Sequence, residues 1–285
     1  MERLQLSRVV GDELLALLND LPSEVVAIEP LAGRGHCPSF RLALADGQVF
    51  KAKRLRSALD AERVERLLRR LDHPAFPPVR MRRGAAILTS WVDGPQLSAA
   101  EADPDLLRVC GATQAFVHGR GPLSGPSRAS RRSRAHRLAG PRRDLDTLVA
   151  AGWIARDEAA AALQVAARHA PDDWTVGLVH GDFNPENLVR AEAGGIAVID
   201  NETVSIGARA YDLARTWYRW PMSAPQRAAY LAGYRGHGGV DEFEPHLPFW
   251  AVSVLARGAA FRLHTGQRGV AEPIARLREG LPTWR

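Results

Sequence analysis

Lysine and cysteine are the residues that this sequence uses least. Lys51 and Lys53 are the only lysines among 38 lysines and arginines, so arginine carries almost all of the positive charge. Cys37 and Cys110 are too few for a disulfide framework, which favours a protein of a reducing cytoplasm. No run approaches 18 consecutive apolar residues, so the sequence predicts no membrane span.

The positive charge is concentrated in one segment. The net charge is +6, and residues 128–143, RASRRSRAHRLAGPRR, contain seven arginines and no acid. Two interpretations stay open for this segment: a solvated arginine-rich surface, or a patch that binds an anionic substrate or nucleic acid. It lacks interleaved aromatic residues and any known nucleic-acid-binding module, which argues against nucleic acid.

The pattern of apolar residues changes along the chain. Alternating runs over 39–55 predict a hairpin with an Asp-Gly turn, and 57–72 has the apolar stripe of a helix. After about residue 100 helical patterns dominate, apart from a β-rich patch over 175–202. The sequence therefore predicts an α+β protein with a β-rich part, 1–92, and a mostly helical part, 93–285. A cleft between such parts is a common ligand site.

Polar residues gather at the ends of the apolar runs in VHGDFNPENLV and IAVIDNE. His180 and Asp182 follow one run, Asn187 comes five residues after Asp182, and Asp200 ends the next run. Because strands hold both ends of this loop, the carboxylate and amide oxygens can converge. Such hard oxygen ligands suit Mg²⁺, which completes its shell with water and phosphates. That assignment leaves Asp182 to receive a proton.

Three motifs in this order resemble one family. HGDFNPEN matches the His-x-Asp-(four residues)-Asn loop of the aminoglycoside phosphotransferase and choline kinase-like enzymes, which are small-molecule relatives of the protein kinases. VIDNE is similar to the family's metal-binding Asp motif, and ARAYDLART to its Asp-Leu-Ala segment. Asn201 departs from the pattern, since the family usually has an aromatic residue there.

The resemblance implies a two-lobed protein-kinase-like fold and transfer of a phosphoryl group from ATP or GTP to a hydroxyl of a small molecule. Asp182 is then the expected catalytic base, and Asn187 and Asp200 the expected Mg²⁺ ligands. Asp212 is expected to brace the catalytic loop from a buried position, and His180 to support that loop.

The resemblance also implies a lysine on the third strand, held by a helix glutamate, which grips the nucleotide phosphates. Lys51 and Lys53 lie two apart and so face the same side of their strand. A compact ammonium fits between phosphates better than a planar guanidinium does. The kinase pattern of a small or branched residue two before the lysine favours Lys51, with Lys53 as the alternative. Glu65, which flanks the apolar stripe of its helix, is the expected partner, since Glu62 projects almost opposite to that stripe.

Further nucleotide contacts follow from the same resemblance. Gly33 and Gly35 lie where a loop covers the nucleotide, and glycine lets backbone approach phosphates closely. The segment from Thr89 to Trp91 resembles the hinge whose backbone binds adenine. Core packing is an equal alternative for the Trp91 side chain.

The acceptor is left open between two classes. An antibiotic kinase for a cationic drug would need acids, and the candidates are Asp241, Glu242 and Glu244. A metabolic kinase for a sugar, an amino alcohol or an anionic metabolite could instead use Arg131, Arg132 or Arg134.

A third hypothesis is a degraded kinase that binds nucleic acid or another polyanion through 128–143. The presence of the base, both metal ligands and a strand lysine argues against it. The sequence sets neither the nucleotide, ATP or GTP, nor the oligomeric state.

Overall fold

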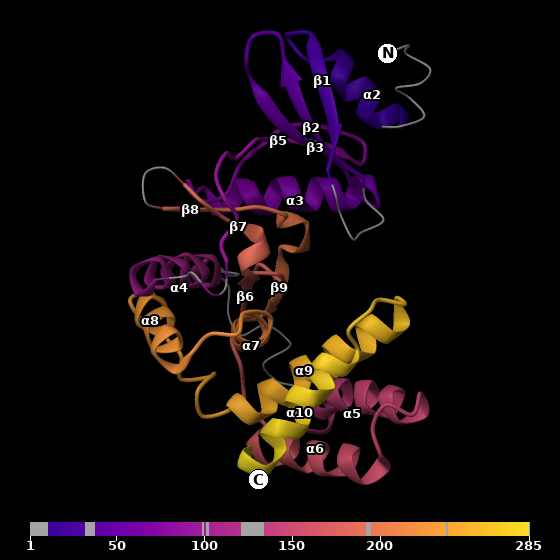
Figure 1. Cartoon of the computed structure of the whole chain (residues 1–285), viewed down its shortest axis with the longest axis vertical. Helices are drawn as coiled ribbons and strands as arrows, with labels where there is room; N and C mark the ends of the chain where they lie inside the picture. The colour runs from indigo at the N-terminus through magenta and orange to yellow at the C-terminus, as the bar shows by residue number, and fades with distance from the viewer. Residues whose placement is uncertain are drawn as a thin grey trace. The chain divides into compact units, whose positions relative to one another are not determined.

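The computed structural model describes residues 11–31, 38–98, 100, 103–120, 134–191, 195–237 and 239–284. The chain divides into two compact units (Figure 1). The first unit contains Met1–Ser98 with Pro185–Val204, and the second contains Ala99–Asn184 with Ser205–Arg285. The predicted α+β class, with an antiparallel sheet in the first part and helices in the second, is confirmed. The first unit also takes in a hairpin from within the predicted helical part.

A five-stranded antiparallel sheet forms the centre of the first unit, in the order β1-β2-β3-β5-β4. Its strands are β1 (Val25–Pro30), β2 (Ser39–Leu44), β3 (Val49–Arg54), β4 (Val79–Arg83) and β5 (Ala86–Ser90). The predicted Asp-Gly turn joins β2 to β3, where Gly47 has a φ of 85° and the Asp46 side chain accepts from the Gln48 N–H at 3.0 Å. This turn fixes the register of β3, which carries both lysines.

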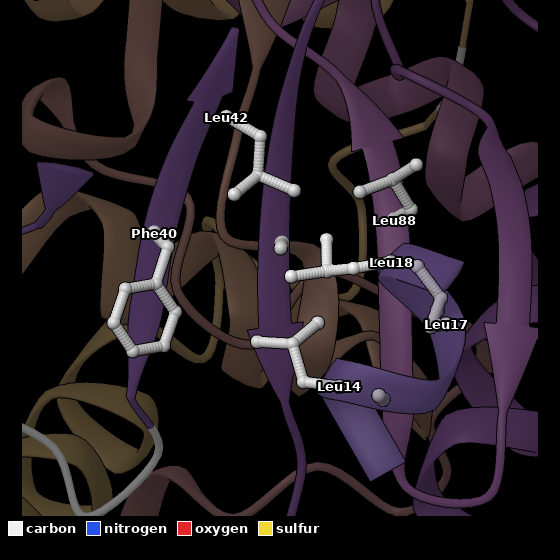
Figure 2. Close-up of a cluster of buried hydrophobic side chains, with 8 residues drawn as sticks. Leu14, Leu17, Leu18, Phe40, Leu42 and Leu88 are labelled. Atoms are coloured by element: carbon white, nitrogen blue, oxygen red, sulfur yellow. The ribbon is translucent and has the colours of Figure 1, made fainter. Parts of the chain in front are cut away.

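One face of the sheet is covered by α2 (Asp12–Asn19). Leu14, Leu17 and Leu18 of α2 pack against sheet residues that include Phe40, Leu42, Ala52 and Leu88 (Figure 2). Because side chains alternate along a strand, the burial of Ala52 on this face directs Lys51 and Lys53 to the opposite face. The packing of α2 thus determines on which face of the sheet the lysines lie.

Two further elements complete the first unit. Helix α3 (Ala58–Leu71) is N-capped by Ser57, whose hydroxyl accepts from the Asp60 N–H. It buries Val64, Leu67, Leu68 and Leu71 of the predicted apolar stripe, while Leu59 is exposed. The β7–β8 hairpin (Leu188–Arg190 and Ile196–Val198) is preceded by the 3₁₀ turn η2 (Pro185–Asn187) and followed by η3 (Asn201–Thr203). The N–H of Val198 donates to the Ala75 carbonyl at 2.6 Å, which ties the hairpin to the segment after α3.

The second unit is mostly helical. Its two-stranded antiparallel sheet pairs β6 (Val176–Val179) with β9 (Ser205–Ala208). Its helices are α4 (Pro104–Gly119), α5 (Arg134–Ala150), α6 (Arg156–His169), α7 (Arg209–Arg219), α8 (Ala224–Arg235), α9 (Leu247–His264) and α10 (Ala271–Trp284). Helix α9 buries ten of its 18 residues and packs against α5, α6, α7 and α10. In the described part of the chain, no helix has the length and apolarity that crossing a bilayer needs.

Close backbone approach joins α4 to α8. A Cβ atom added at Gly111 would lie 2.0 Å from the Tyr230 carbonyl oxygen, and one at Gly233 would lie 2.0 Å from the Arg108 carbonyl oxygen. Glycine at both positions lets the two helices touch. This contact brings Gln114 and His118 of α4 close to Tyr230 and Tyr234 of α8.

Candidate active site

The first unit contains a cavity of about 660 Å³ on the sheet face opposite α2. The residues that line it include several of the predicted nucleotide and metal contacts: Lys51, Lys53, Thr89, Trp91 and Asp200. Trp91 is half-buried, with the Arg41 guanidinium 5.4 Å from its ring centre and its indole N–H donating to Asp93. Gly33 and Gly35, predicted for the covering loop, lie outside the described residues.

Both lysines bind Asp200. The ammonium groups of Lys51 and Lys53 donate to Asp200 Oδ1, and Lys53 also donates to Glu202 Oε1. Burial acts to lower the pKa of Lys53, but the charges of Glu202 and Asp200 outweigh it and raise that pKa. Burial likewise acts to raise the pKa of Asp200, and the two ammonium groups outweigh it and lower that pKa. Lys53 and Asp200 therefore stay charged around neutral pH.

Glu65 has other partners than the one expected. Its carboxylate accepts from Arg69 at 2.8 Å and from Arg82 at 2.7 Å. Arg69 lies one helical turn away and Arg82 lies on β4, which α3 contacts, so both guanidinium groups are within easy reach. Among the described residues, Lys51 pairs with Asp200 rather than with Glu65.

Glu202 is the carboxylate that the sequence interpretation missed. It lies two residues after Asp200 in VIDNE, so the motif itself contained the signal. The 3₁₀ turn η3, which follows Asp200, carries Glu202 to Lys53.

The two predicted metal ligands lie at one end of the β7–β8 hairpin. The Ile199 N–H donates to the Asn187 carbonyl at 2.9 Å, which continues the β7–β8 hydrogen-bond ladder by one residue pair. Asp200 directly follows Ile199 and so lies next to this pair. Asp200 has a left-handed backbone with φ 57° and ψ 48°, which costs a non-glycine residue roughly 1 kcal/mol or more and is often found at functional sites. An amide and a carboxylate oxygen form a donor set that fits a hard divalent cation.

In the second unit, Asp182 lies in the loop after β6 with two arginines at its carboxylate. Asp182 Oδ1 accepts from Arg219 at 2.6 Å and from Arg215 at 3.3 Å. Both arginines are on α7, four residues apart and so on one face of the helix. The sequence interpretation missed them, although their spacing directly after Asp212 was a usable signal.

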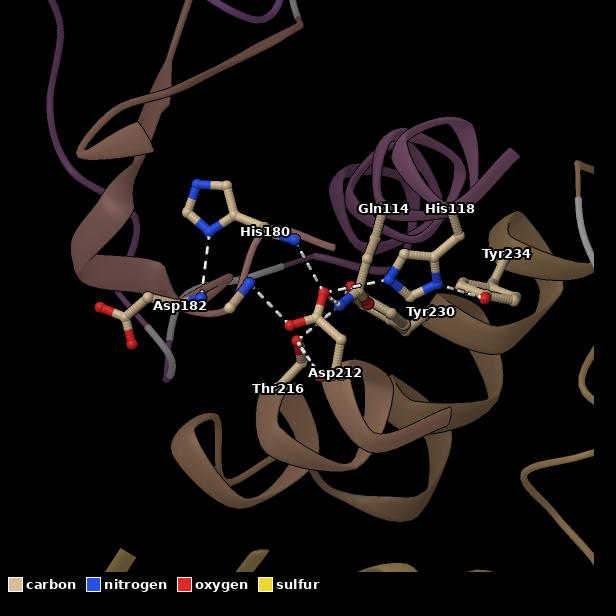
Figure 3. A network of polar contacts seen from close by, with 9 residues as sticks. Gln114, His118, His180, Asp182, Asp212, Thr216, Tyr230 and Tyr234 are labelled. Atoms are coloured by element: carbon tan, nitrogen blue, oxygen red, sulfur yellow. Dashed lines mark hydrogen bonds and ion pairs between the residues drawn. The ribbon is translucent and has the colours of Figure 1, made fainter. Parts of the chain in front are cut away.

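Asp212 is the centre of a buried network behind this loop (Figure 3). Its carboxylate accepts from the backbone N–H groups of His180 at 3.1 Å and Gly181 at 2.8 Å, and it contacts His118 Nε2 at 3.0 Å. Burial acts to raise the pKa of Asp212, but the hydrogen bond and charge of His118 outweigh it and lower that pKa to about 2. Asp212 thus links the backbone of the loop to His118 of α4, and its bracing role stays a prediction.

His180 supports the loop from the other side. Its side chain is fully buried, and its Nδ1 accepts from the Asp182 N–H at 3.2 Å. Figure 3 shows the Asp182 carboxylate directed away from Asp212. Asp212 and His180 thus fix the backbone of the loop, while the Asp182 side chain faces Arg215 and Arg219.

Comparison with known proteins identifies the family. The model of a phosphotransferase enzyme family matches residues 28–246, which is more than half of the chain. The chain belongs to this family. The resemblance drawn from the three motifs and the prediction of a small-molecule kinase are confirmed at this level. No curated protein matches the phosphotransferase in sequence.

Solved structures share the fold of this phosphotransferase. The choline kinase LicA from Streptococcus pneumoniae has a TM-score of 0.69 at 13% identity, covering 98% of this chain and 99% of its own. The macrolide 2′-phosphotransferase MphH from Brachybacterium faecium has a TM-score of 0.66 at 20% identity, covering 93% and 96%. The amicoumacin kinase hAmiN, in complex with AMP-PNP, Ca²⁺ and Ami, has a TM-score of 0.63 at 16% identity, covering 97% and 95%.

Two of the three acids named as candidates for a cationic acceptor, Glu242 and Glu244, have structural partners in this phosphotransferase. Glu242 accepts from the backbone N–H of Thr175 at 2.6 Å and from its hydroxyl, next to the start of β6. Glu244 pairs with Arg235 at 2.6 Å, and Asp241 is exposed. Arg131 and Arg132 lie outside the described residues, and Arg134 is the first residue of α5.

Proposed function

We propose that this phosphotransferase moves the γ-phosphate of ATP to a hydroxyl of a small molecule. The observation that carries the proposal is the convergence of Lys51, Lys53 and Asp200 on one cavity of the first unit. Two ammonium groups and a carboxylate in a partly buried pocket are the groups that a nucleoside triphosphate with a divalent cation requires. The complex of the amicoumacin kinase with AMP-PNP and Ca²⁺ supports this reading.

Asn187 and Asp200 would hold Mg²⁺, since their oxygens suit that ion. When bound, the ion supplies positive charge to the phosphate oxygens as negative charge develops on them. The lysines supply the same kind of stabilisation from β3. The Trp91 N–H donates to the Val49 carbonyl at 3.1 Å, so other backbone groups around Thr89 to Trp91 would bind the base. GTP is the second candidate nucleotide.

Asp182 is the proposed general base. The acceptor oxygen forms a bond to the γ-phosphorus, the bond from that phosphorus to the bridging oxygen breaks, and ADP leaves with the bridging oxygen. The hydroxyl proton passes to the Asp182 carboxylate. Asp212 and His180 set the geometry of this step by fixing the loop backbone. Arg215 and Arg219 orient the carboxylate.

The test is an ADP-release assay with the full chain, ATP or GTP, Mg²⁺ and a panel of hydroxylated acceptors, run on the wild type and on Asp182→Asn. We expect one acceptor class to stimulate ADP release, and Asp182→Asn to lower that rate by about 10²- to 10⁴-fold. Equal rates in wild type and variant across the panel would contradict the proposal and favour a degraded kinase that binds a polyanion.

A further inference from the structure

The second unit contains its own cavity, of about 270 Å³, among α7, α9 and α10. Five arginines line it: Arg215 and Arg219 from α7, Arg257 and Arg262 from α9, and Arg276 from α10. Glu272 is the acid in the same lining. This composition differs from the acidic pocket that a polycationic drug would need.

The cavity lies beside the proposed catalytic base. Arg215 and Arg219 are in its lining and at the same time donate to Asp182 Oδ1 at 3.3 and 2.6 Å. All of these residues belong to the second unit. Asp182 itself is not in the lining, so Arg215 and Arg219 are the groups that connect a molecule seated in the cavity to that carboxylate.

The acids around the cavity only partly neutralise its arginines. Arg262 and Arg276 share Glu272 at 2.9 Å each, and Arg215 and Arg219 share Asp182. Arg257 pairs with Asp144 at 3.5 Å, and Arg143 shares that carboxylate. Each carboxylate is thus divided between two guanidinium groups, which leaves positive charge in the lining.

Gln267 and two tyrosines, Tyr211 and Tyr218, also line the cavity. Burial raises the pKa of Tyr211 and of Tyr218, which keeps both phenols neutral and able to donate hydrogen bonds. The two tyrosines therefore add no negative charge to the lining.

We propose that the acceptor is an anion: a compact hydroxylated molecule that carries a carboxylate or phosphate group bound by the arginines of this cavity. The proposal rests on the proposed function and names its acceptor class. Guanidinium groups bind carboxylate and phosphate oxygens through two parallel hydrogen bonds, whereas an ammonium group would meet like charge. The volume of about 270 Å³ lies just below the usual range for ligand pockets, roughly 300–1,000 Å³, which favours a small metabolite over a large antibiotic.

A binding experiment isolates the charge of the ligand. Glucose 6-phosphate, glucuronate, glucose and glucosamine share a sugar ring and differ in charge. Each is titrated calorimetrically into the full chain saturated with ADP, which occupies the nucleotide site. We expect both anions to bind at least tenfold more tightly than glucose, and glucosamine to bind no more tightly than glucose. If neither anion binds, or if glucosamine binds as tightly as the anions, the inference is overturned.

Variants of α10 assign the binding to this cavity. Arg276→Gln is expected to weaken binding of both anions at least fivefold, while Arg278→Gln on the same helix, whose side chain pairs with Glu158 outside the cavity, leaves it unchanged. Glu272→Gln is expected to strengthen anion binding two- to fivefold, a gain that unfolding cannot imitate. Equal affinities in wild type, Arg276→Gln and Glu272→Gln would overturn the inference.

A turnover screen separates this inference from the proposed function. Hydroxy acids and sugar phosphates are compared with polyols, amino alcohols and aminoglycosides by acceptor-dependent ADP release that Asp182→Asn abolishes. The highest kcat/KM is expected in the anionic group. A cationic or neutral best acceptor overturns the inference and leaves the kinase proposal standing. If no acceptor gives Asp182-dependent release, the kinase proposal fails, and the binding experiment still decides whether the cavity takes anions.

Discussion

Asp200 and Asp212 are both surrounded by donors, but the donors differ in kind. The Asp200 side chain is 36% exposed, and two flexible lysine side chains reach it from β3. The Asp212 side chain is 2% exposed, and backbone N–H groups and an imidazole surround it. Lysine side chains can rotate to exchange one oxygen partner for another, whereas backbone groups cannot. The comparison suggests a ligand-binding aspartate in one unit and a structural aspartate in the other.

Replacing Asp200 gives the largest expected effect on turnover. Asp200→Ala removes a proposed metal ligand and is expected to lower kcat by about 10³-fold. Because the ion pairs of Lys51 and Lys53 with Asp200 are partly exposed, we expect the loss of Asp200 to change the free energy of unfolding by only about 1 kcal/mol. Steady-state kinetics and thermal unfolding measure the two effects. Glu62→Ala, an exposed site on α3, is the control and should change neither.

Replacing Asp212 is expected to have a larger effect on stability than replacing Asp200. Asp212→Ala leaves buried N–H groups and His118 without their acceptor and is expected to cost about 3 kcal/mol of unfolding free energy. Chemical denaturation measures it, with the exposed Asp146→Ala on α5 as the matched control. If Asp212→Ala were as stable as Asp146→Ala, the structural role assigned to Asp212 would be wrong.

Alanine substitutions can also distinguish the contributions of Lys51 and Lys53 to the use of ATP. Lys51 faces Thr89 and Lys53 faces Ile87 across β3 and β5, so Lys53 lies farther from the hinge and nearer to where phosphates would extend. Lys53 also binds Glu202, which favours it over Lys51, the residue that the sequence pattern suggested. We expect Lys53→Ala to lower kcat/KM for ATP about 10²-fold. Lys51→Ala, the matched variant on the same strand, should lower it far less, and the opposite order would reassign the role to Lys51.

Acid should weaken the second unit through Asp212. Its pKa of about 2 lies below the ordinary value of 3.8, so its ionised form stabilises the fold. That contribution, about 2 kcal/mol, is complete above about pH 5 and is lost progressively as the pH falls toward 2. The difference in unfolding free energy between wild type and Asp212→Asn should therefore shrink between pH 5 and pH 2.5. A constant difference would contradict the lowered pKa.

The sequence predicted those residues whose spacing is fixed by local structure. The catalytic loop motif contains Asp182 and Asn187 within one loop, and a two-residue strand period puts both lysines on one face. Partners chosen by tertiary packing were harder to predict. Glu65 and Glu202 were both available to a lysine, and the packing of α3 beside β4 directed Glu65 to Arg82 instead. The arginine cavity combines three helices, so no single stretch of sequence reveals it.

The scarcity of lysine has a practical chemical consequence. Lys51 and Lys53 carry the only ε-amines of the chain, and both line one cavity. A reagent selective for such amines, an acyl phosphate of a nucleotide for example, can therefore acylate no other side chain of that type. Modification of both lysines would leave residues 42–54 as one tryptic peptide, while modification of one would keep the cleavage at the other. The masses of the tryptic peptides would then show which of the two lysines the reagent has modified, and hence whether a ligand in this cavity protects either one.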